Sequence, residues 1–533
     1  MKKEWQYQAG YYKASIPLTY LSGNFVYTSF GTMTSASPVP CGRICNGWND
    51  DVFSCDVIVC GDEENKQFVL AGALTAFRSL SFFTVKYRFR QFTEIEVQQP
   101  DIKAGEKPEE LIILEGSDWR ELLFEYADLS AEKMGVKKIS SAKNMTGYCS
   151  WYYYYKDVTQ AHLLENVEAL VANRSVFAAD YVQIDDGYQT RQGDWLERHA
   201  NWPVPLDAIA KKITDNGMTA GIWIMPFVAS SASKVYQEHP EWFVKDENGE
   251  TVTKPGWTPA PDNHWACLDP TQEVVQKHLQ HVFRTFRSMG FTYFKMDGLC
   301  YGLQQGVRQD RNATSVSAFR QGLKAIRDAV PDCLLMACSG PFMPVMGLVD
   351  NVRVSNDTSR YFMNNPETRN FPIHDSSISA AVRLSLSHFW KFDRWYRCDP
   401  DVLMARQDNA FYTRGEAKIS VLSGIMTGVC ITSDHLGTIA SDRLDLLGKA
   451  QNLRMCDVKP VLTGYKCEWP SIYEGTLNGQ RALALLNETP SSIRYIFSDL
   501  NLPDKCVDLL DEKKYFKEFE LPSHDAVLLT AEN

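Results

Sequence analysis

The sequence has no long apolar run, little histidine and no excess of positive charge, and each deficit excludes a class of protein. No stretch of the 533 residues approaches about 18 uninterrupted apolar side chains, so no membrane-spanning helix is expected. The formal net charge of −11 argues against a nucleic-acid-binding protein and against binding to an anionic membrane. A neutral or small polar substrate fits this charge better.

Short motifs for several kinds of chemistry are also missing. The sequence has no G-x-G-x-x-G, G-x-x-x-x-G-K-[ST] or G-x-S-x-G pattern, so neither a phosphate-binding loop nor a nucleophile elbow is predicted, and no cofactor is expected. Lys2 and Lys3 are not followed by an apolar run. No signal peptide is therefore predicted, and a cytoplasmic location is expected.

The 14 cysteines include no C-x-x-C pair, although Cys41, Cys45, Cys55 and Cys60 lie close together in the sequence. In a reducing cytoplasm these residues are expected to be free thiols in or near the core. Buried cysteine is therefore favoured for this group, and a zinc site is the alternative.

What is present is a change of pattern that divides the chain into three regions. Residues 1–135 are rich in short β-branched and aromatic segments, which predicts an N-terminal β-rich domain. Residues 136–450 alternate strand-like and helical segments, which predicts a parallel sheet wrapped by helices. Residues 451–533 return to short strands between turn residues, which predicts a small antiparallel, sandwich-like β domain.

The strand-like segments of the central region number eight, which is the number that closes a (β/α)8 barrel. They cover residues 147–155, 181–186, 220–227, 293–297, 333–339, 351–357, 397–404 and 428–434. The segments between them have helical periodicity. One of these helices is expected to begin with Asp269 as its N-cap and to end at Gly290.

A barrel carries its reactive groups at the C-terminal ends of its strands, so the residues there form the candidate site. Carboxylates occur at most of these ends, and two cations on neighbouring strands are placed to hold some of them ionised. The residues at the strand ends are Trp151, Asp185, Asp186, Trp223, Lys295, Asp297, Cys338, Ser339, Arg353, Asp357, Asp399, Asp401 and Asp434.

Two chemistries use such a ring of carboxylates. Glycoside hydrolysis needs two carboxyl groups that flank the scissile bond, and strands four and six place Asp297 and Asp357 on one rim. This placement leaves retaining and inverting mechanisms open. A metal centre is the competing use, but none of the ten histidines ends one of the first seven strands. Lys295 also opposes a cation beside Asp297, so no metal is expected.

Residues 147–440 resemble clan D glycoside hydrolases, families 36 and 27, whose best-known members are α-galactosidases. YFKMD (293–297) is similar to the family's strand-four motif, and RVSND (353–357) resembles its R-x-x-x-D motif on strand six. QIDDGY (183–188) is similar to the family's D-D-G-W/Y segment. The stretch 202–227 resembles family 36, whereas CDPDVLMA (398–405) is more similar to family 27.

The resemblance implies a retaining α-galactosidase that works by double displacement. Asp297 is implied to be the nucleophile and Asp357 the general acid/base, with Arg353 as its positioning partner. The remaining residues are implied to bind the sugar. This set is Trp151 and Trp223 as walls, Asp185 and Asp186 at the hydroxyls on C4 and C6, Lys295 and Arg353 at other hydroxyls, and Cys338 and Ser339 beside C2.

The sequence departs from family 36 after the fifth strand, where CSGPFMP (338–344) has Pro341 in place of a usual glycine. Because this segment faces the C2 substituent in the family, α-N-acetylgalactosaminidase activity is an alternative, as is raffinose-type α-galactosyl transglycosylation. A sugar-binding protein that has lost catalysis is a further alternative, which the presence of both predicted aspartates disfavours. Assembly into a homo-oligomer stays open.

Overall fold

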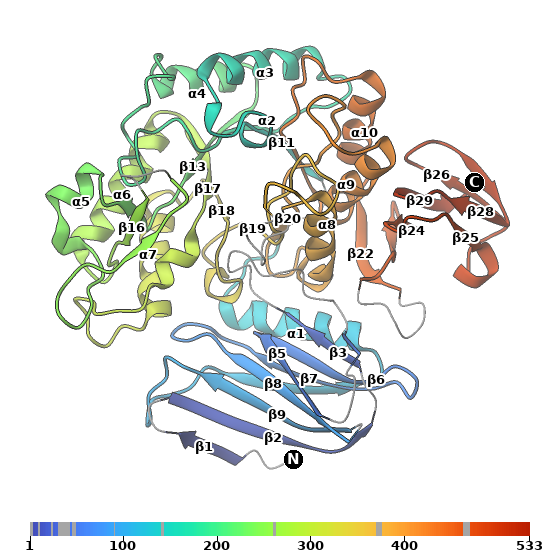
Figure 1. The fold of residues 1–533 in the computed structure, drawn as a ribbon, viewed down its shortest axis with the longest axis horizontal. Helices are drawn as coiled ribbons and strands as arrows, with labels where there is room; N and C mark the ends of the chain where they lie inside the picture. The colour runs from blue at the N-terminus through green and yellow to red at the C-terminus, as the bar shows by residue number, and fades with distance from the viewer. Residues whose placement is uncertain are drawn as a thin grey trace.

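The computed structural model describes residues 4–8, 11–22, 25–29, 43–44, 49–89, 91–139, 143–258, 263–368, 376–461 and 469–532. The predicted fold class is confirmed: a parallel barrel is joined to an N-terminal β region, below it in Figure 1, and to a C-terminal β region at its right. The boundaries 1–135, 136–450 and 451–533 stay a prediction. No helix among the described residues has the length and apolarity needed to cross a membrane.

The N-terminal region consists of two antiparallel sheets of five strands each. Alternation along β8 shows why these segments form strands: Phe83, Val85 and Tyr87 are buried, while the residues between them are half-buried. One sheet has the order β1 (Glu4–Gln8), β2 (Tyr11–Ser22), β9 (Gln91–Gln99), β8 (Phe82–Arg88), β5 (Asn49–Cys55). The other has the order β10 (Leu111–Gly116), β7 (Gln67–Ala73), β6 (Val57–Asp62), β3 (Phe25–Thr28), β4 (Arg43–Ile44).

Helix α1 (Trp119–Met134) connects these sheets to the barrel. It begins at a capping residue, since the side chain of Asp118 accepts a hydrogen bond from the backbone of Arg120, and it ends at Gly135 in the left-handed conformation. The hydroxyl of Tyr126 donates to carbonyl groups in the N-terminal sheets, and the indole of Trp395 from the barrel donates to Ser130 of the helix at 2.9 Å. The helix is therefore bound on both sides.

Every pair of neighbouring strands in the central sheet is parallel. Leu403, just after β20, bridges Thr432 of β21, so the two edges of the sheet meet and the barrel is nearly closed. In chain order the strands are β11 (Met145–Cys149), β12 (Tyr181–Ile184), β13 (Thr219–Ile224), β17 (Phe291–Met296), β18 (Leu334–Ala337), β19 (Asn351–Arg353), β20 (Arg397–Asp399) and β21 (Val429–Thr432).

Helices surround this sheet, as the periodicity predicts. They are α3 (Gln160–Ala172), α4 (Leu206–Asp215), α6 (Glu273–Ser288), α7 (Ser315–Ala329), α8 (Ile378–Ser387), α9 (Arg414–Thr427) and α10 (Ser441–Asn452). The connection between β13 and β17 carries, besides α6, the short helix α5 (Lys234–Glu238) and a small sheet of β14 (Val228–Ser230), β16 (His264–Cys267) and β15 (Thr253–Pro255).

Two of the predicted boundaries are wrong. The first barrel strand ends at Cys149, and Trp151–Tyr154 form the short helix α2, because burial of Tyr152 overrides the β-propensity of the tyrosine run. Helix α6 begins at Glu273 instead of after Asp269. The Asp269 carboxylate instead accepts hydrogen bonds from Thr271 and from the backbone of Gln309, so it closes a turn before the helix.

The C-terminal region is one antiparallel sheet of eight strands. Along β24 both faces are buried in alternation: Ala482 and Ala484 pack against the barrel side, whereas Leu483 and Leu485 belong to the domain's own core. The strand order is β22 (Met455–Pro460), β23 (Ile472–Leu477), β24 (Gln480–Asn487), β29 (Asp525–Ala531), β26 (Lys505–Asp508), β27 (Lys514–Phe516), β28 (Glu518–Leu521), β25 (Ile493–Ile496).

Candidate active site

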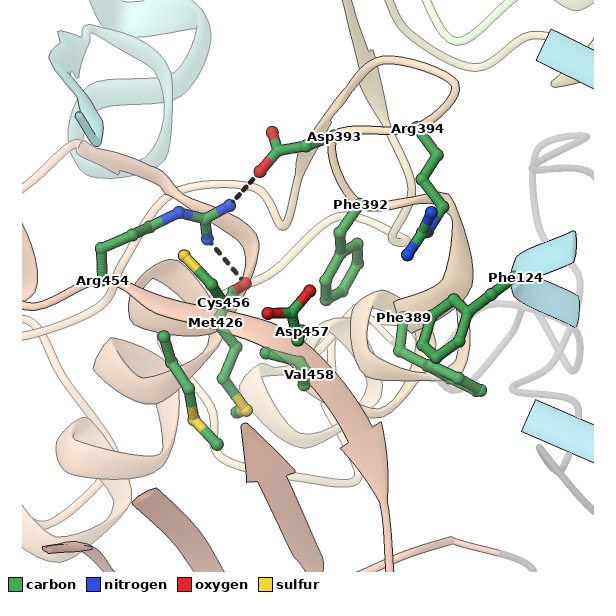
Figure 2. A pocket seen from close by; sticks show the side chains of 11 residues that line it. Phe124, Phe389, Phe392, Asp393, Arg394, Met426, Arg454, Cys456, Asp457 and Val458 are labelled. Atoms are coloured by element: carbon green, nitrogen blue, oxygen red, sulfur yellow. Dashed lines mark hydrogen bonds and ion pairs between the residues drawn. The ribbon is translucent and has the colours of Figure 1, made fainter. Parts of the chain in front are cut away.

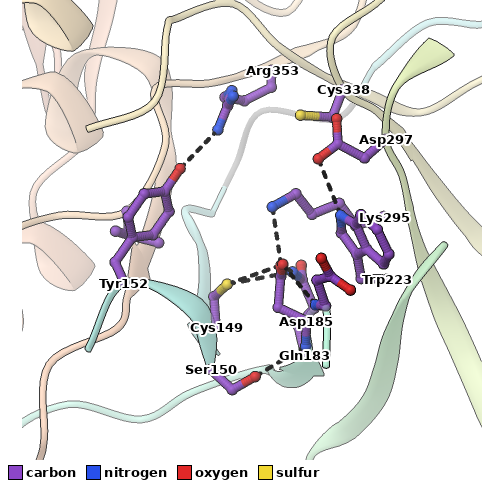
Figure 3. Close-up of polar contacts among 12 residues, drawn as sticks. Cys149, Ser150, Tyr152, Gln183, Asp185, Trp223, Lys295, Asp297, Cys338 and Arg353 are labelled. Atoms are coloured by element: carbon purple, nitrogen blue, oxygen red, sulfur yellow. Dashed lines mark hydrogen bonds and ion pairs between the residues drawn. The ribbon is translucent and has the colours of Figure 1, made fainter. Parts of the chain in front are cut away.

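Polar residues from neighbouring barrel strands meet at the C-terminal ends of those strands (Figure 3). The parallel register explains this, because Trp223 of β13 pairs with Lys295 of β17, and Met296 of β17 pairs with Ala337 of β18. Residues that follow these pairs therefore leave the barrel on one side.

Asp297 follows β17 directly and is partly exposed. The indole N–H of Trp223 donates to its Oδ2 at 3.0 Å, and the backbone N–H of Gly298 donates to its Oδ1 at 2.7 Å. Burial raises the pKa of this carboxyl group, but the cations of Lys295 and Arg353, together with these two donors, lower it to about 2. Asp297 is therefore ionised throughout the neutral range.

Lys295 is buried and donates from Nζ to Oδ2 of Asp185 at 3.0 Å. Burial alone would lower the pKa of this amine, but the Asp185 carboxylate holds it well above its ordinary value. The same oxygen of Asp185 also accepts from Nε2 of Gln183 at 2.5 Å and from the thiol of Cys149 at 3.3 Å. Asp185 is thus fixed by three donors from strands β11, β12 and β17.

Asp186 has a different setting. It is half-buried, and its Oδ1 accepts from Nε2 of Gln189 at 2.5 Å. Burial, with the neighbouring charges of Asp185 and Asp297, raises the pKa of its carboxyl group to about 6. Asp186 therefore takes up a proton below about pH 6.

Arg353 ends β19 and is buried, and its guanidinium group binds two carboxylates. One nitrogen contacts Oδ1 of Asp357, and the other lies 3.0 Å from Oδ2 of Asp401. Burial raises the pKa of Asp357, but Arg353 lowers it to below its ordinary value despite the opposing charge of Asp297. The Asp357 side chain remains 47% exposed, so it is accessible to a ligand.

Tyr152, which lies outside the predicted set, and Asp401, which belongs to the predicted ring of strand-end carboxylates, complete this network. The hydroxyl of Tyr152 donates to Oδ2 of Asp401 at 2.5 Å and accepts from Arg353 at 3.2 Å. Asp401 also accepts from the backbone N–H of Thr358 at 2.9 Å, next to Asp357. The tyrosine run and the C-D-P-D segment are sequence signals for these residues, but neither signal shows that they meet at Arg353.

The other predicted residues lie at this end of the barrel in differing states of exposure. Trp151 begins α2, is half-buried and contacts Tyr155 edge-on, with ring centroids 5.6 Å apart. Trp223 is 2% exposed and Cys338 is completely buried. Ser339 has a φ of 52°, a left-handed conformation that non-glycine residues rarely adopt and that fixes the turn after β18.

The prediction that Asp434 is one of the accessible carboxylates at the strand ends is wrong. It forms an ion pair with Arg406 in which neither side chain is exposed, and it accepts backbone N–H groups of Ala405 and Arg406 at 2.9 Å. Asp399 is also buried, and burial raises the pKa of its carboxyl group to about 6. Asp434 thus joins the ends of β20 and β21, Asp399 accepts from the backbone N–H of Asp401, and both are too buried to contact a ligand.

Cavities also lie away from these residues. One of about 170 Å³, between α1, η5 (Phe389–Lys391) and β22, is bounded by an ion pair of Arg454 and Asp393 (Figure 2). A larger one of about 600 Å³ is lined by residues at the start of the barrel strands, including Tyr181, Thr219 and Asn351. It therefore lies at the end of the barrel opposite the carboxylates.

The alternative prediction of a zinc site rests on Cys41, Cys45, Cys55 and Cys60. Cys41 and Cys45 lie outside the described residues, whereas Cys55 and Cys60 are buried. Across the described part of the chain, no cluster of three or more His, Cys, Asp or Glu residues has the geometry to hold a metal ion.

The Melibiase family model matches residues 120–330, which include Asp185, Asp186, Lys295 and Asp297. Alpha-galactosidase 1 of Pediococcus pentosaceus is 23% identical over 263 residues, 45% of this chain and 33% of that protein. The A type blood alpha-D-galactosamine galactosaminidase of Flavonifractor plautii is 31% identical over 121 residues, 22% of this chain and 11% of that protein. The chain thus spans a third or less of these relatives' length.

Solved structures of low sequence identity share the fold. The α-galactosidase TtGalA from Thermus thermophilus, in complex with p-nitrophenyl alpha-D-galactopyranoside, has a TM-score of 0.70 at 20% identity, covering 90% of this chain and 95% of that one. The GH36 α-galactosidase AgaA from Geobacillus stearothermophilus has a TM-score of 0.64 at 12% identity, covering 98% and 77%. The resemblance of the sequence to clan D, family 36 is thereby confirmed: residues 120–330 match the Melibiase model, and the chain has the fold of these α-galactosidases.

Proposed function

We propose that this protein is a retaining α-galactosidase that hydrolyses terminal α-linked galactose from oligosaccharides or glycoconjugates. The observation that carries the proposal is the contrast between two accessible carboxylates. Asp297 receives two hydrogen bonds and is kept ionised, as a nucleophile requires, while Asp357 is held by Arg353 on a separate strand end. Glycoside hydrolysis needs two carboxyl groups in such separate roles.

In the first step a carboxylate oxygen of Asp297 attacks the anomeric carbon, and the bond from that carbon to the leaving oxygen breaks. Asp357 transfers its proton to that oxygen, and a β-linked galactosyl ester of Asp297 remains. In the second step water attacks the anomeric carbon while Asp357 takes up its proton, and the ester bond breaks. Two inversions return an α product, so configuration is retained.

The charges around Asp357 change in the direction that these two steps require. The negative charge of Asp297 raises the pKa of Asp357, and this charge disappears when the galactosyl ester forms. The pKa of Asp357 then falls further, which favours its role as base in the second step. The first step requires a protonated Asp357, which the negative charge of Asp297 favours and the positive charge of Arg353 opposes.

The remaining residues are assigned to sugar binding. Asp186 is partly exposed, whereas Asp185 is buried, and Asp186 is assigned to bind the hydroxyl groups at C4 and C6 of galactose. Asp185 supports it there and orients Lys295 through their 3.0 Å contact. Arg353 binds a hydroxyl group and positions Asp357. Trp151, Trp223, Cys338 and Ser339 are assigned to the walls of the sugar site.

A second candidate activity is α-N-acetylgalactosaminidase. Two observations favour it: Pro341 follows the Cys338–Ser339 turn, where the C2 substituent is expected, and the Flavonifractor plautii relative is a galactosaminidase. Raffinose-type transglycosylation uses the same two carboxylates and is the other alternative. A catalytically inactive sugar-binding protein is the least favoured. The cytoplasmic location and any homo-oligomer stay predictions.

The proposal is tested by comparing nitrophenyl α-galactoside with nitrophenyl α-N-acetylgalactosaminide as substrates of the purified protein. We expect kcat/KM to be higher for the galactoside. Higher activity on the acetylated substrate would establish the second candidate, and no cleavage of either would overturn both. A repeat in EDTA is expected to leave the rate unchanged, and loss of activity there would indicate a metal-dependent hydrolase.

A further inference from the structure

An exposed aromatic platform lies close along the chain to Asp357. Tyr361 and Phe411 stack with ring centroids 4.9 Å apart and an interplanar angle of 6°. The guanidinium carbon of Arg360 lies 5.6 Å from the centre of the first ring and 5.4 Å from the centre of the second. Phe411 remains 60% exposed although Tyr361 covers one of its faces. A large apolar ring is thus presented to solvent.

Hydrogen bonds hold this platform in place. The backbone N–H of Phe411 donates to the carbonyl of Arg360 at 2.8 Å. Arg360 donates to Oδ1 of Asn409 at 2.7 Å and forms an ion pair with Glu367, which also accepts from the hydroxyl of Tyr361 at 3.2 Å. Fixed side chains lose little conformational entropy when a ligand binds, so the platform is preorganised.

The platform lies near Asp357, the proposed general acid. Arg360 follows Asp357 by three residues, so their Cα atoms are at most about 11 Å apart. Burial raises the pKa of the Tyr155 hydroxyl, and the charges of Glu367, Arg360 and Asp357 also act on it, after that of Arg406, so Tyr155 lies near both the platform and Asp357. A general acid must reach the leaving oxygen, and the group bonded to that oxygen therefore passes Asp357.

We propose that Arg360, Tyr361 and Phe411 form a subsite for the sugar that leaves with that oxygen. The inference rests on the proposed function and names its substrate class: oligosaccharides whose galactose is linked to another sugar. The apolar C–H face of the leaving sugar stacks on Phe411. Its hydroxyl groups bind Glu367 and Asn409, both of which are exposed at the edge of the platform.

The test compares Phe411→Ala with wild type on melibiose, raffinose and α-galactosyl fluoride. Fluoride leaves no sugar on the platform, so kcat/KM for α-galactosyl fluoride should stay unchanged. For the two oligosaccharides kcat/KM should fall about five- to tenfold, the range expected for one lost stacking contact. Phe411→Tyr should restore most of the loss. Phe516→Ala, another exposed phenylalanine (56%) in the C-terminal sheet, is the matched control and should change none of the three rates.

Each other outcome is decisive. Equal losses on α-galactosyl fluoride and on the oligosaccharides would assign Phe411 a structural role and overturn the subsite, as would unchanged rates on all three substrates. Neither result would affect the proposed function. Failure of the wild-type protein to cleave α-galactosyl fluoride would overturn the proposed function itself, and the subsite with it.

Discussion

Lys295 donates its hydrogen bond to Asp185 at 3.0 Å, while Asp297, two residues further along, receives its hydrogen bonds from Trp223 and Gly298. The lysine therefore acts on Asp297 through its charge and not through the contact it makes. The K-x-D spacing alone suggests that Lys295 binds Asp297, whereas the lysine binds Asp185 and only its charge acts on Asp297. The Asp185 carboxylate is paired with a buried cation, and a carboxylate oxygen of Asp297 stays available for nucleophilic attack.

Breaking the Lys295–Asp185 pair should destabilise the fold. Lys295→Met leaves a buried carboxylate without its cation, and we expect the free energy of unfolding to fall by about 3–5 kcal/mol. Asp185→Asn should also be destabilising. The double variant should lose clearly less than the sum of the two single losses, because the second change removes the unpaired charge. Urea unfolding measures all three, and additive losses would show that the pair does not interact.

Removing the donor to Asp297 should reduce catalysis without unfolding the protein. Trp223→Phe keeps the ring in the core but removes the N–H that lies 3.0 Å from Oδ2. A hydrogen bond to a charged group contributes about 1.5–3 kcal/mol, so we expect kcat/KM to fall at least about tenfold. The matched control is Trp195→Phe, because Trp195 contacts the Trp223 ring edge-on at 5.9 Å. A comparable loss in the control would assign the effect to packing.

The raised pKa of Asp186 predicts a pH dependence of stability. Its folded pKa is about 6 against an ordinary 3.8, so between about pH 4 and 6 the folded state binds more protons than the unfolded state. This contribution stabilises the protein at low pH and is lost as pH rises through 6. Asp186→Asn should therefore be more stable relative to wild type at pH 7 than at pH 4. Urea unfolding at both values checks this, and an identical difference at each would refute the assignment.

The acid role of Asp357 predicts a dependence on the leaving group. Melibiose releases a sugar alkoxide that needs a proton, whereas α-galactosyl fluoride releases a good leaving group. General acid catalysis contributes about 10²–10⁴-fold, so Asp357→Ala should lower kcat/KM for melibiose by about 100-fold or more. The loss for α-galactosyl fluoride should be much smaller. Equal losses on both substrates would count against the acid role.

The sequence predicted the barrel because each strand carries its own pattern. All eight barrel strands overlap the predicted segments. For seven of them the observed strand differs from the predicted segment mainly at its ends. The first differs more, since Trp151–Tyr154 form a helix. Local propensity favours a strand there, but the buried hydroxyl of Tyr152 bonds Asp401 and Arg353, which are more than 200 residues away. Such distant contacts have no local signal.

The strand ends likewise predicted which residues gather in the site but not how they pair. Asp297, Asp357, Lys295 and Arg353 lie at the same end of the barrel, as the strand order requires. The partners of these residues depend on side-chain geometry, as the Lys295–Asp185 contact illustrates. Asp434 has the same strand-end position but forms a completely buried ion pair with Arg406, and a single carboxylate at a strand end carries no signal for that difference.

The central claim is that Asp297 attacks the sugar from one face, while Asp357 acts as general acid and base on the opposite face. Reaction with azide tests this claim most directly. In Asp297→Ala, azide can replace the missing carboxylate, and the product of α-galactosyl fluoride should be β-galactosyl azide. In Asp357→Ala, azide should attack the galactosyl ester of Asp297 in place of water and give α-galactosyl azide. Nuclear magnetic resonance distinguishes the two products. Interchanged products would reverse the two assignments, and a fully active Asp297→Ala would contradict the account.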